Sequence, residues 1–387
     1  MAEEQLALQI GDAFVMKILL VSGPGISLKE PYNSGIEAFI VSFANKLAGE
    51  GHTAHVLACD ADAGADFTLV NPFSGSVTDK PGFFNRLRQR RQFKNLDVHS
   101  YDLIHYNMFY PHLLKEGSYF NKTSFLTLHS PADRKRTAAY KKISRQWDVT
   151  FVAISHRIKH QWDRALGADI PLICNGINMD LWPTRSSRED AYLLWSARIA
   201  KEKNVAAAIC VAKHMRLPLK IAGRIADQRY FDEEVKPHLN SQIKYVGHVT
   251  QRQLSGLAKN TLAYLATATW QEPFGLAALE MLASGVPVVG FTTAVPPDWE
   301  HESVLTTPSL RWQNLIELVI KSTDISPHVC KEFASSMSIQ NMTSNYVKLY
   351  REVLLKKGMS EEAVFADEPR AKNGVSQTAN SEADVDL

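Results

Sequence analysis

The chain has 387 residues and a mass of 43.3 kDa, and at roughly 100–200 residues per domain this length predicts two domains. Hydrophobic residues at 45% and charged residues at 22% exclude collagen-like and wholly disordered proteins. The net charge of +2 gives no reason to expect nucleic acid as a partner, so we predict none.

The amino-terminal region and the cysteines indicate the compartment. The apolar run at residues 14–21 contains Lys17 and has the length of a strand, so it fits neither a membrane-spanning helix nor a secretory signal. The four cysteines are far apart and form no Cys-x-x-Cys pair, which argues against a disulfide scaffold and a structural zinc site. We therefore predict a cytoplasmic protein with reduced thiols.

Short aliphatic runs alternate with helix-like stretches along most of the chain. The first pair, residues 17–22 and 36–47, predicts a strand followed by a helix. Further strands are predicted at residues 54–59, 103–106, 124–128 and 150–154, and then at 192–196, 219–221, 243–246, 262–265 and 286–289. Each series is typical of a doubly wound parallel sheet, so we expect an α/β protein with two Rossmann-like domains.

Composition shifts divide the chain further. Cys174, Asn175 and Gly176 open a polar segment that predicts a turn and a linker, whereas the end of the chain is acidic and lacks apolar periodicity. The predicted parts are an N-terminal extension (1–15), an N-terminal domain (16–174), a linker (175–190), a C-terminal domain (191–340), a final helix that returns to the N-terminal domain (341–358) and a disordered acidic tail (359–387).

The strongest chemical signal is a pair of glutamates at the start of a predicted helix. Pro273 and Gly275 suit a loop that enters a helix, so Glu272 precedes the helix and Glu280 lies roughly two turns inside it. The amides of residues 274–276 are then free to bind an anion such as a diphosphate. The alternative is that Glu272 only complements the helix dipole and that Glu280 is a solvated surface residue.

Two cations follow the strand predicted at residues 192–196. Arg198 can bind phosphate as a fork, and Lys203 supplies a compact charge. Cations are unfavourable near the amino-terminal end of a helix unless an anion lies between them and the helix. Fixed cations here would stabilise the negative charge of a bound phosphate group.

Two further candidates lie in the N-terminal domain. Gly35, within the segment from Pro31 to Glu37, would let the backbone approach a phosphate closely, although a simple turn at a helix start is the alternative. His129 follows the strand at residues 124–128, at the edge where doubly wound sheets bind ligands. A lone histidine is more commonly structural, so this assignment depends on its position.

Taken together, these segments resemble the retaining GT-B glycosyltransferases of family four over most of residues 17–355. The resemblance implies two domains that face each other across a cleft, with the acceptor on the N-terminal side and the nucleotide sugar on the C-terminal side. It assigns donor-sugar hydroxyls to Glu272 and the ribose to Glu280. It also implies that the donor phosphate binds Phe274, Gly275, Leu276 and Gly35. Arg198 and Lys203 would stabilise the departing diphosphate, and His129 would contact the donor sugar near the reacting carbon.

The sequence departs from the family pattern in several places. Ser34 replaces the first glycine of the Gly-Gly-x-Glu loop, and Ala197 and Asn204 occupy positions where glycines are common. Cys174 takes the place of a proline in the linker motif. The segment 291–296 lacks the usual Gly-Gly-x-Pro-Glu pattern, which suggests a loop adapted to a particular substrate.

The resemblance implies transfer of a hexose from a UDP- or GDP-linked sugar to a glycan, lipid-linked or small-molecule acceptor. No Asp-x-Asp element suits a metal, so we expect no cofactor and no metal. A nucleotide-sugar epimerase and a non-catalytic binding protein are alternatives. A nicotinamide-dependent oxidoreductase is disfavoured, because the fingerprint begun by Gly23 and Gly25 has Leu28 in place of its third glycine.

A basic segment in the N-terminal domain suggests contact with lipids. The apolar residues Phe83, Phe84 and Leu87 alternate with Arg86, Arg88, Arg90 and Arg91, and a second basic cluster follows His129. These features predict peripheral association with the anionic cytoplasmic face of a membrane. The alternative is a pair of solvated surface helices whose charge is balanced by the acidic tail.

Overall fold

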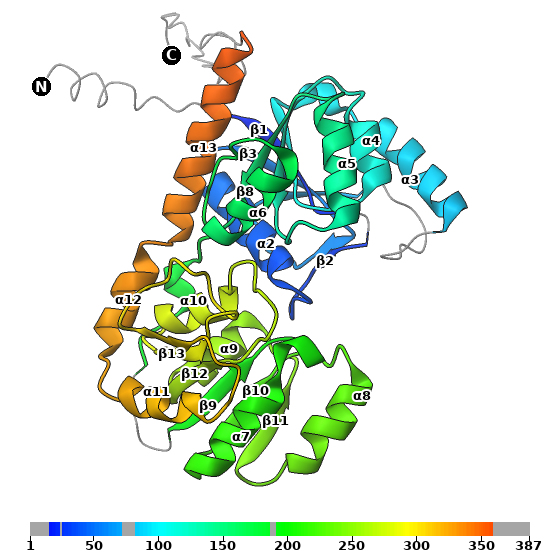
Figure 1. Ribbon diagram of the computed structural model, residues 1–387. Coiled ribbons are helices and arrows are strands. Elements are labelled where there is room, and N and C mark those ends of the chain that lie inside the picture. Colours follow the sequence, from blue (N-terminus) through cyan, green and yellow to red (C-terminus); the bar gives the residue numbers. More distant parts are fainter. Residues whose placement is uncertain (1–14, 24, 72–81, 186–190, 359–387) are drawn as a thin grey trace, which may run out of the picture.

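The computed structural model describes residues 15–23, 25–71, 82–185 and 191–358, which form two α/β domains, one above the other in Figure 1. The predicted N-terminal extension up to residue 14, residues 186–190 of the predicted linker and the predicted tail lie outside the described residues. The expectation of two Rossmann-like domains is confirmed.

The first domain is built on a parallel sheet whose described strands run in the order β5-β3-β1-β6-β7-β8. Its strands are β1 (Lys17–Val21), β3 (Thr53–Leu57), β5 (Thr68–Val70), β6 (Leu103–Tyr106), β7 (Thr123–Leu128) and β8 (Val149–Ala153), and a separate pair joins β2 (Ser27–Leu28) to β4 (Asp60–Ala61). The strand order reverses at β1, and ligands bind at such a switch point beside the carboxyl ends of the strands.

The helices of the first domain follow from capping and apolar spacing. Helix α2 (Gly35–Gly49) begins after Ser34, whose hydroxyl accepts a hydrogen bond from the Ile36 amide, and it buries Phe39, Phe43 and Leu47. The other helices are α3 (Phe83–Lys94), α4 (Pro111–Gly117), α5 (Arg134–Ser144) and α6 (His156–Leu166), with a 3₁₀ turn at Val98–Ser100.

The second domain repeats the architecture with strands in the order β11-β10-β9-β12-β13-β14. They are β9 (Tyr192–Ser196), β10 (Leu219–Ala222), β11 (Ile243–Gly247), β12 (Thr261–Ala266), β13 (Val288–Phe291) and β14 (Val304–Thr307). The helices are α7 (Val205–Met215), α8 (Gln228–Tyr230), α9 (Gln251–Ala258), α10 (Leu276–Ala283), α11 (Asn314–Ser322) and α12 (Pro327–Ser335), with short helical turns at Met179–Leu181, Lys201–Lys203, Phe231–Val235 and Lys236–His238.

The last predicted strand of the second domain is shifted. Residues 286 and 287 precede β13, because Gly285 adopts a φ of +76° and the Val286 amide still bonds to the carbonyl of Met281 in α10. The hydrophobic run therefore begins in the turn that ends a helix and not in the strand. The edge strands β5 and β14 are short, and the sequence pattern did not reveal them.

The chain crosses between the domains twice, and the two crossings contact each other. The predicted turn at Asn175 and Gly176 is wrong, because the segment passes directly into a parallel bridge between Ile177 and Ser338. The Ile177 amide donates a hydrogen bond to the Met337 carbonyl at 3.1 Å, and the Ile339 amide donates one to the Ile177 carbonyl at 2.8 Å. A Cβ at Gly176 would lie 2.3 Å from the Ser338 carbonyl oxygen, so only glycine fits at this crossing.

The final helix α13 (Ile339–Lys356) rises from the second domain along the first (Figure 1). It packs on α2 through buried residues that include Tyr346 and Tyr350. The Tyr350 hydroxyl lies 2.5 Å from His105 Nδ1, and His105 Nε2 lies 2.6 Å from the Thr127 hydroxyl, which in turn contacts Tyr346. This buried hydrogen-bonded chain joins the last helix to the first sheet. None of the helices in the described ranges combines the length and apolar character needed to cross a bilayer.

Candidate active site

A cavity of about 400 Å³ lies between the two domains. Both sheets direct the carboxyl ends of strands towards it, through His129 after β7 and Ala197 after β9. All nine site residues predicted from the sequence line this cavity, namely Gly35, His129, Arg198, Lys203, Glu272, Phe274, Gly275, Leu276 and Glu280. Residues more than 200 positions apart are thus brought together at one place.

The loop before α10 has the shape of an anion-binding helix start. Gly275 caps the helix with a φ of +91°, a conformation that favours glycine. Phe274 is buried and packs edge-to-face on Trp299, with ring centroids 5.5 Å apart. The loop is therefore anchored by an aromatic side chain, while its backbone amides lie at the amino-terminal end of the helix, where an anion is favoured.

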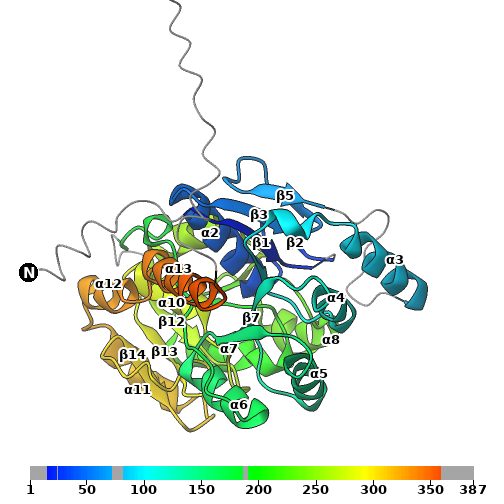
Figure 2. The ribbon, with the colours of Figure 1, turned by 90° about the horizontal axis from the view of Figure 1, so that it is seen from above.

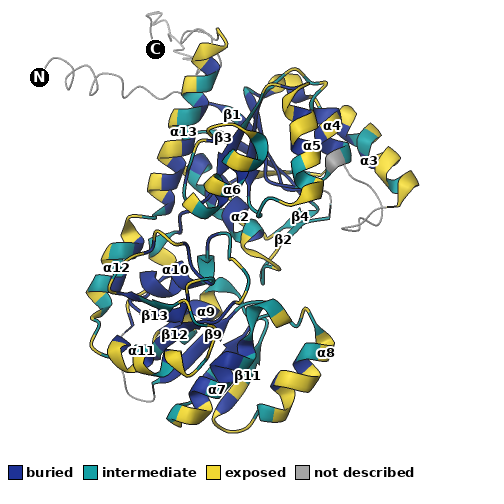
Figure 3. Ribbon diagram, in the orientation of Figure 1, coloured by how far each residue is buried: buried dark blue, intermediate teal, exposed yellow. Residues whose placement is uncertain are grey.

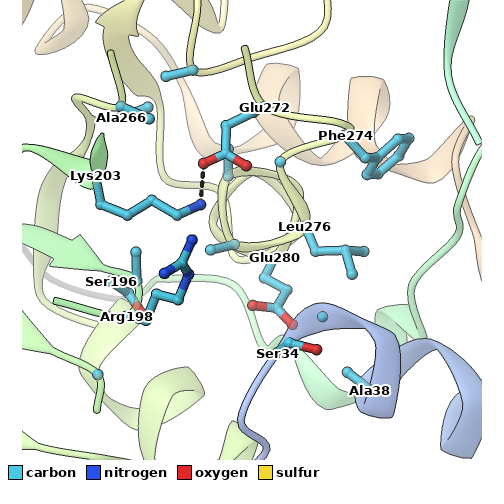
Figure 4. A pocket seen from close by; sticks show the side chains of 18 of the residues that line it. Ser34, Ala38, Ser196, Arg198, Lys203, Ala266, Glu272, Phe274, Leu276 and Glu280 are labelled. Carbon is cyan, nitrogen blue, oxygen red and sulfur yellow. Dashed lines mark hydrogen bonds and ion pairs between the residues drawn. The ribbon is translucent and has the colours of Figure 1, made fainter. Parts of the chain in front are cut away.

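Glu272 belongs to a compact charged group at this loop. Its carboxylate forms an ion pair with Lys203 and accepts a hydrogen bond from Trp270 Nε1 at 2.9 Å. Figure 4 shows Lys203 pointing at Glu272, with the Arg198 guanidinium beside Lys203 and the Glu280 carboxylate extending towards Ser34 of the first domain. The side chains of Lys203 and Glu272 are only 14% and 13% exposed, so this ion pair is largely shielded from water.

The backbone around Lys203 is held by Thr267, the residue that follows β12. Asn204, where the family commonly has glycine, adopts a left-handed φ of +54°, which asparagine tolerates. The Thr267 hydroxyl lies 2.8 Å from the carbonyl oxygen of Asn204. Arg198 is more exposed than Lys203, and its guanidinium pairs with Glu202 at 2.5 Å. Both predicted cations therefore have carboxylate partners.

Glu280 is buried at the floor of the cavity, so the alternative of a solvated surface residue is wrong. Helix α10 starts at Leu276, which places Glu280 about one turn inside it and not two. Its carboxylate accepts a hydrogen bond from Gln251 Nε2 at 3.2 Å. Burial is the main cause that raises the pKa of Glu280 to about 7, the Gln251 bond opposes the shift, and the nearby charge of Glu30 adds to it.

The wall contributed by the first domain begins at α2. Ser34, which replaces a family glycine, caps this helix and donates a hydrogen bond to the carboxylate of Glu37. Burial raises the pKa of Glu37. A Cβ at Gly35 would lie 2.8 Å from Leu276 Cδ1 in the second domain, so a larger residue here would displace the end of the Leu276 side chain. Phosphate contact by Gly35 stays a prediction.

His129 is half-buried at the opposite side of this wall. Its Nε2 lies 3.0 Å from Asn107 Oδ1, and its ring meets Phe39 edge-on at 4.8 Å. Burial lowers the pKa of His129 to about 3, so the ring is neutral at pH 7. Because the amide oxygen of Asn107 accepts, Nε2 carries the proton and Nδ1 remains a weakly basic acceptor.

The loop before α2 reaches across the cavity through contacts that its sequence does not reveal. His248 Nε2 donates to the Tyr32 carbonyl at 2.8 Å, Arg224 Nε donates to the Asn33 carbonyl at 3.2 Å, and the amide of α9's first residue donates to the Glu30 carboxylate at 3.0 Å. Most of these bonds end on backbone atoms, which leave no mark in a motif.

This loop lies beside the turn after β10, through the bond between Arg224 and Asn33. Gly223 there has a φ of +133°, and a Cβ would lie 1.9 Å from the Ala197 carbonyl oxygen. A second missed contact joins Ser155 and Arg157 of the first domain to the loop around Glu272. The described residues contain no group of three or more His, Cys, Asp or Glu side chains suited to a metal ion.

Two family descriptions match the chain in succession. Residues 33–181 match the family described as Glycosyltransferase Family 4, and residues 180–334 match Glycosyl transferases group 1. Glycogen synthase from two strains of Mycobacterium tuberculosis is 33% identical over 131 residues. That alignment covers 32% of this chain and 31% of each synthase, so the chain matches about a third of the length of these relatives.

Solved structures share the fold over nearly the whole described chain. Sucrose-phosphate synthase from Thermosynechococcus elongatus has a TM-score of 0.72 at 17% identity and covers 88% of this chain and 100% of its own. A glycosyltransferase from Rickettsia africae has a TM-score of 0.69 at 15% identity, and the alignment covers 88% of this chain and 99% of that structure. Anabaena HepE in complex with UDP-glucose has a TM-score of 0.67 at 16% identity, and the alignment covers 88% of this chain and 100% of that structure.

The raised pKa of Glu280 predicts a pH-dependent stability. The folded chain holds a proton on Glu280 up to about pH 7, whereas the unfolded chain releases it near 4.5, so stability is lost as the pH rises through this interval. Glu280→Gln removes the titrating group. We expect the free energy of unfolding of this variant to exceed that of the wild type by roughly 1–3 kcal/mol at pH 8. The variant should therefore unfold at a higher temperature at pH 8, and the difference should shrink towards pH 5.

Thermal unfolding at a series of pH values measures this difference. Glu300→Gln is the matched control, because Glu300 is exposed, and it should follow the wild type at every pH. A stability difference between Glu280→Gln and the wild type that is constant from pH 5 to pH 8 would contradict the burial argument.

Proposed function

Because residues 33–181 and 180–334 match two glycosyltransferase families and the chain has the GT-B fold, we propose that it transfers a hexose from a nucleotide diphosphate sugar to an acceptor hydroxyl, with retention of the anomeric configuration. The observation that carries the proposal is the meeting of Glu272, Glu280, Arg198 and Lys203 with the start of α10 in one cavity. The acceptor class is a glycan, a lipid-linked sugar or a small molecule.

The donor is placed by matching its parts to the charges of the cavity. The diphosphate lies between the amides at the start of α10 and the cations Arg198 and Lys203, since all of these favour negative charge. The sugar hydroxyls donate to Glu272, and the ribose hydroxyls bind Glu280. This arrangement is supported by the shared lining of the cavity and by the relative bound to UDP-glucose.

The bond that breaks joins the anomeric carbon to a diphosphate oxygen, so negative charge grows on the leaving group. Arg198 and Lys203 stabilise that charge, because preorganised cations in a shielded site interact more strongly than they would in water. His129 is a poor general base, since burial lowers its pKa to about 3 and its protonated nitrogen faces Asn107. This weak basicity favours retention over an inverting attack that uses His129 as base.

We also propose that no metal takes part in the transfer. The two cations and the amides at the start of α10 supply positive charge where a divalent ion would otherwise bind the diphosphate. The donor is UDP-linked in this proposal, by analogy with HepE, and a GDP-linked donor is the alternative.

Donor binding and product stereochemistry test the proposal together. In a thermal-shift panel of UDP- and GDP-linked hexoses, the true donor at ~100 times its dissociation constant should add about 2.7 kcal/mol of stability. NMR of the product formed with that donor should show a retained anomeric configuration, and EDTA should leave the rate unchanged. An inverted product would refute retention, and loss of activity that magnesium or manganese restores would refute metal independence.

The leaving-group cations give a sharper prediction. Lys203→Ala should lower kcat by about a hundredfold or more, the usual scale for removing one preorganised transition-state contact. Arg198→Ala should act in the same direction. Glu280→Ala should instead raise the donor KM, because ribose contacts are similar in the ground state and the transition state.

Steady-state kinetics with the donor varied measures both effects. Lys201→Ala is the matched control, since Lys201 lies in the same short turn as Lys203 but is exposed and outside the cavity lining. If Lys203→Ala raised only the donor KM, Lys203 would not stabilise the leaving group.

The first domain carries a surface suited to peripheral membrane binding, which we propose for the cytoplasmic face of an anionic membrane. Helix α3 projects away from both domains (Figure 2), and Figure 3 shows its outer end as exposed. Phe83, Phe84 and Leu87 are 69%, 83% and 43% exposed. Arg88 and Arg91 on the same helix are also exposed, so apolar and basic side chains share this surface.

Arg90 does not belong to this surface, although the sequence pattern grouped it there. Its guanidinium pairs with Glu116, whose side chain is only 1% exposed, and Lys94 approaches the same carboxylate at 3.7 Å. Reversing the charge of Arg90 would leave a buried carboxylate facing another, which destabilises the fold. A test of membrane binding must therefore spare it.

Liposome flotation with anionic vesicles tests this surface. Binding should weaken with salt and fall at least tenfold in Arg88→Glu/Arg91→Glu, since each cation near an anionic surface contributes about 1 kcal/mol. Lys244→Glu/Arg311→Glu, with the same charge change on exposed residues of the second domain, is the control. No flotation of the wild type at low salt would overturn the membrane proposal.

A further inference from the structure

The first turn of α6 reaches from the first domain to the loop that carries Glu272. Ser155 caps α6 and donates its hydroxyl proton to the Pro273 carbonyl at 2.6 Å. The Arg157 guanidinium donates to four carbonyl oxygens of the second domain. These are Glu272 at 2.7 Å and Thr293 at 3.1 Å from one terminal nitrogen, and Thr292 at 3.0 Å and Val295 at 2.8 Å from the other.

The hydrogen bonds of the Arg157 guanidinium end on backbone oxygens, while burial lowers its pKa and the charges of Glu272 and Asp298 oppose that shift. Within the described ranges no carboxylate lies at ion-pair distance from its guanidinium, and Arg157 does not line the cavity. The fixed fork of donors suits several carbonyls converging on one point, an arrangement that a lysine ammonium cannot match. The carbonyls of residues 292, 293 and 295 belong to the segment that departs from the family pattern, so Arg157 binds the loop at which this sequence is unusual.

The two contacts hold the backbone of Glu272 on both sides. Its amide donates to the Thr293 carbonyl at 2.9 Å, its carbonyl accepts from Arg157, and the next carbonyl, at Pro273, accepts from Ser155. The Thr293 hydroxyl in turn donates to the Ala268 carbonyl at 2.6 Å. The peptide planes that set the direction of the Glu272 side chain are thus fixed partly by the other domain.

We propose that Arg157 is a positioning residue that orients Glu272 for the donor sugar when the two domains are closed. This inference rests on the proposed function, because it takes Glu272 as the residue that binds the sugar hydroxyls. Separation of the domains removes the guanidinium from the loop and releases the backbone of Glu272. Closure and formation of the sugar subsite are then one event.

A purely structural tie between the domains is the rival explanation, and the sugar-specific part of donor binding separates the two. If Arg157 positions Glu272, its loss weakens binding of a nucleotide sugar but largely spares the nucleoside diphosphate, which carries no donor sugar for Glu272 to bind. If Arg157 only holds the domains together, both ligands bind more weakly by a similar factor.

The experiment measures dissociation constants by calorimetry for UDP-glucose and for UDP, with GDP-mannose and GDP as a second pair. In Arg157→Met we expect the dissociation constant of the sugar nucleotide to rise at least tenfold and that of the nucleoside diphosphate to change less than twofold. Arg157→Lys, which keeps the charge but loses the fork, should lie between Arg157→Met and the wild type. Arg164→Met, an exposed arginine on the same helix, is the control and should match the wild type.

Each other result overturns the inference. Unchanged binding of the sugar nucleotide in Arg157→Met, or an equal loss for both ligands, would leave Arg157 without a positioning role. If Arg157→Met does not fold, Arg157→Lys decides, and wild-type binding of the sugar nucleotide by that variant would make Arg157 a structural tie only. A wild type that binds none of the nucleotide sugars would refute the proposed function itself, which distinguishes the two failures.

Discussion

The ion pair between Lys203 and Glu272 is the interaction on which the arrangement of the cavity depends. A shielded charge without a partner is costly, so a cleft built to receive a diphosphate needs a way to neutralise its cations before the ligand arrives. Glu272 does this for Lys203, and Glu202 does it for Arg198. In the proposed complex the anion competes for cations that are already oriented, so binding requires exchange of partners and little rearrangement of the backbone.

The two halves of the site belong to different domains, and the chain joins these domains by paired crossings. Ile177 on the way out and Ser338 on the way back form one bridge, and Gly176 leaves no room for a side chain there. Helix α13 then fastens the return crossing to the first sheet through Tyr350, His105 and Thr127. The two crossings therefore form one well-anchored connection between the domains.

Much of this could be predicted from the sequence, because the signals are local. Aliphatic runs marked most strands, and the GT-B fold inferred from the sequence is confirmed. Two glycosyltransferase family descriptions also match residues 33–181 and 180–334. What could not be predicted depends on residues that are distant in sequence. Arg157 bonds to carbonyls 115 to 138 positions away, and backbone acceptors carry no residue type to recognise. The pairing of Arg90 with Glu116 was hidden for the same reason, since both residues match an ordinary exposed helix pattern.

The polar contacts across the cleft share a property that suits a reversible closure. On one side His248 and Arg224 donate to backbone carbonyls of the loop before α2, and on the other side Arg157 and Ser155 donate to the loop before α10. Each such bond contributes only about 0.5–1.5 kcal/mol net, or somewhat more where a charge takes part, because water replaces the partner on opening. Two sets on opposite sides of the cavity close it cooperatively without making it permanent. Gly35 has no side chain, so the Leu276 side chain of the second domain can pack closely against the start of α2. In the proposed reaction, bonds of this strength would hold the donor between the domains and still allow the nucleotide product to leave.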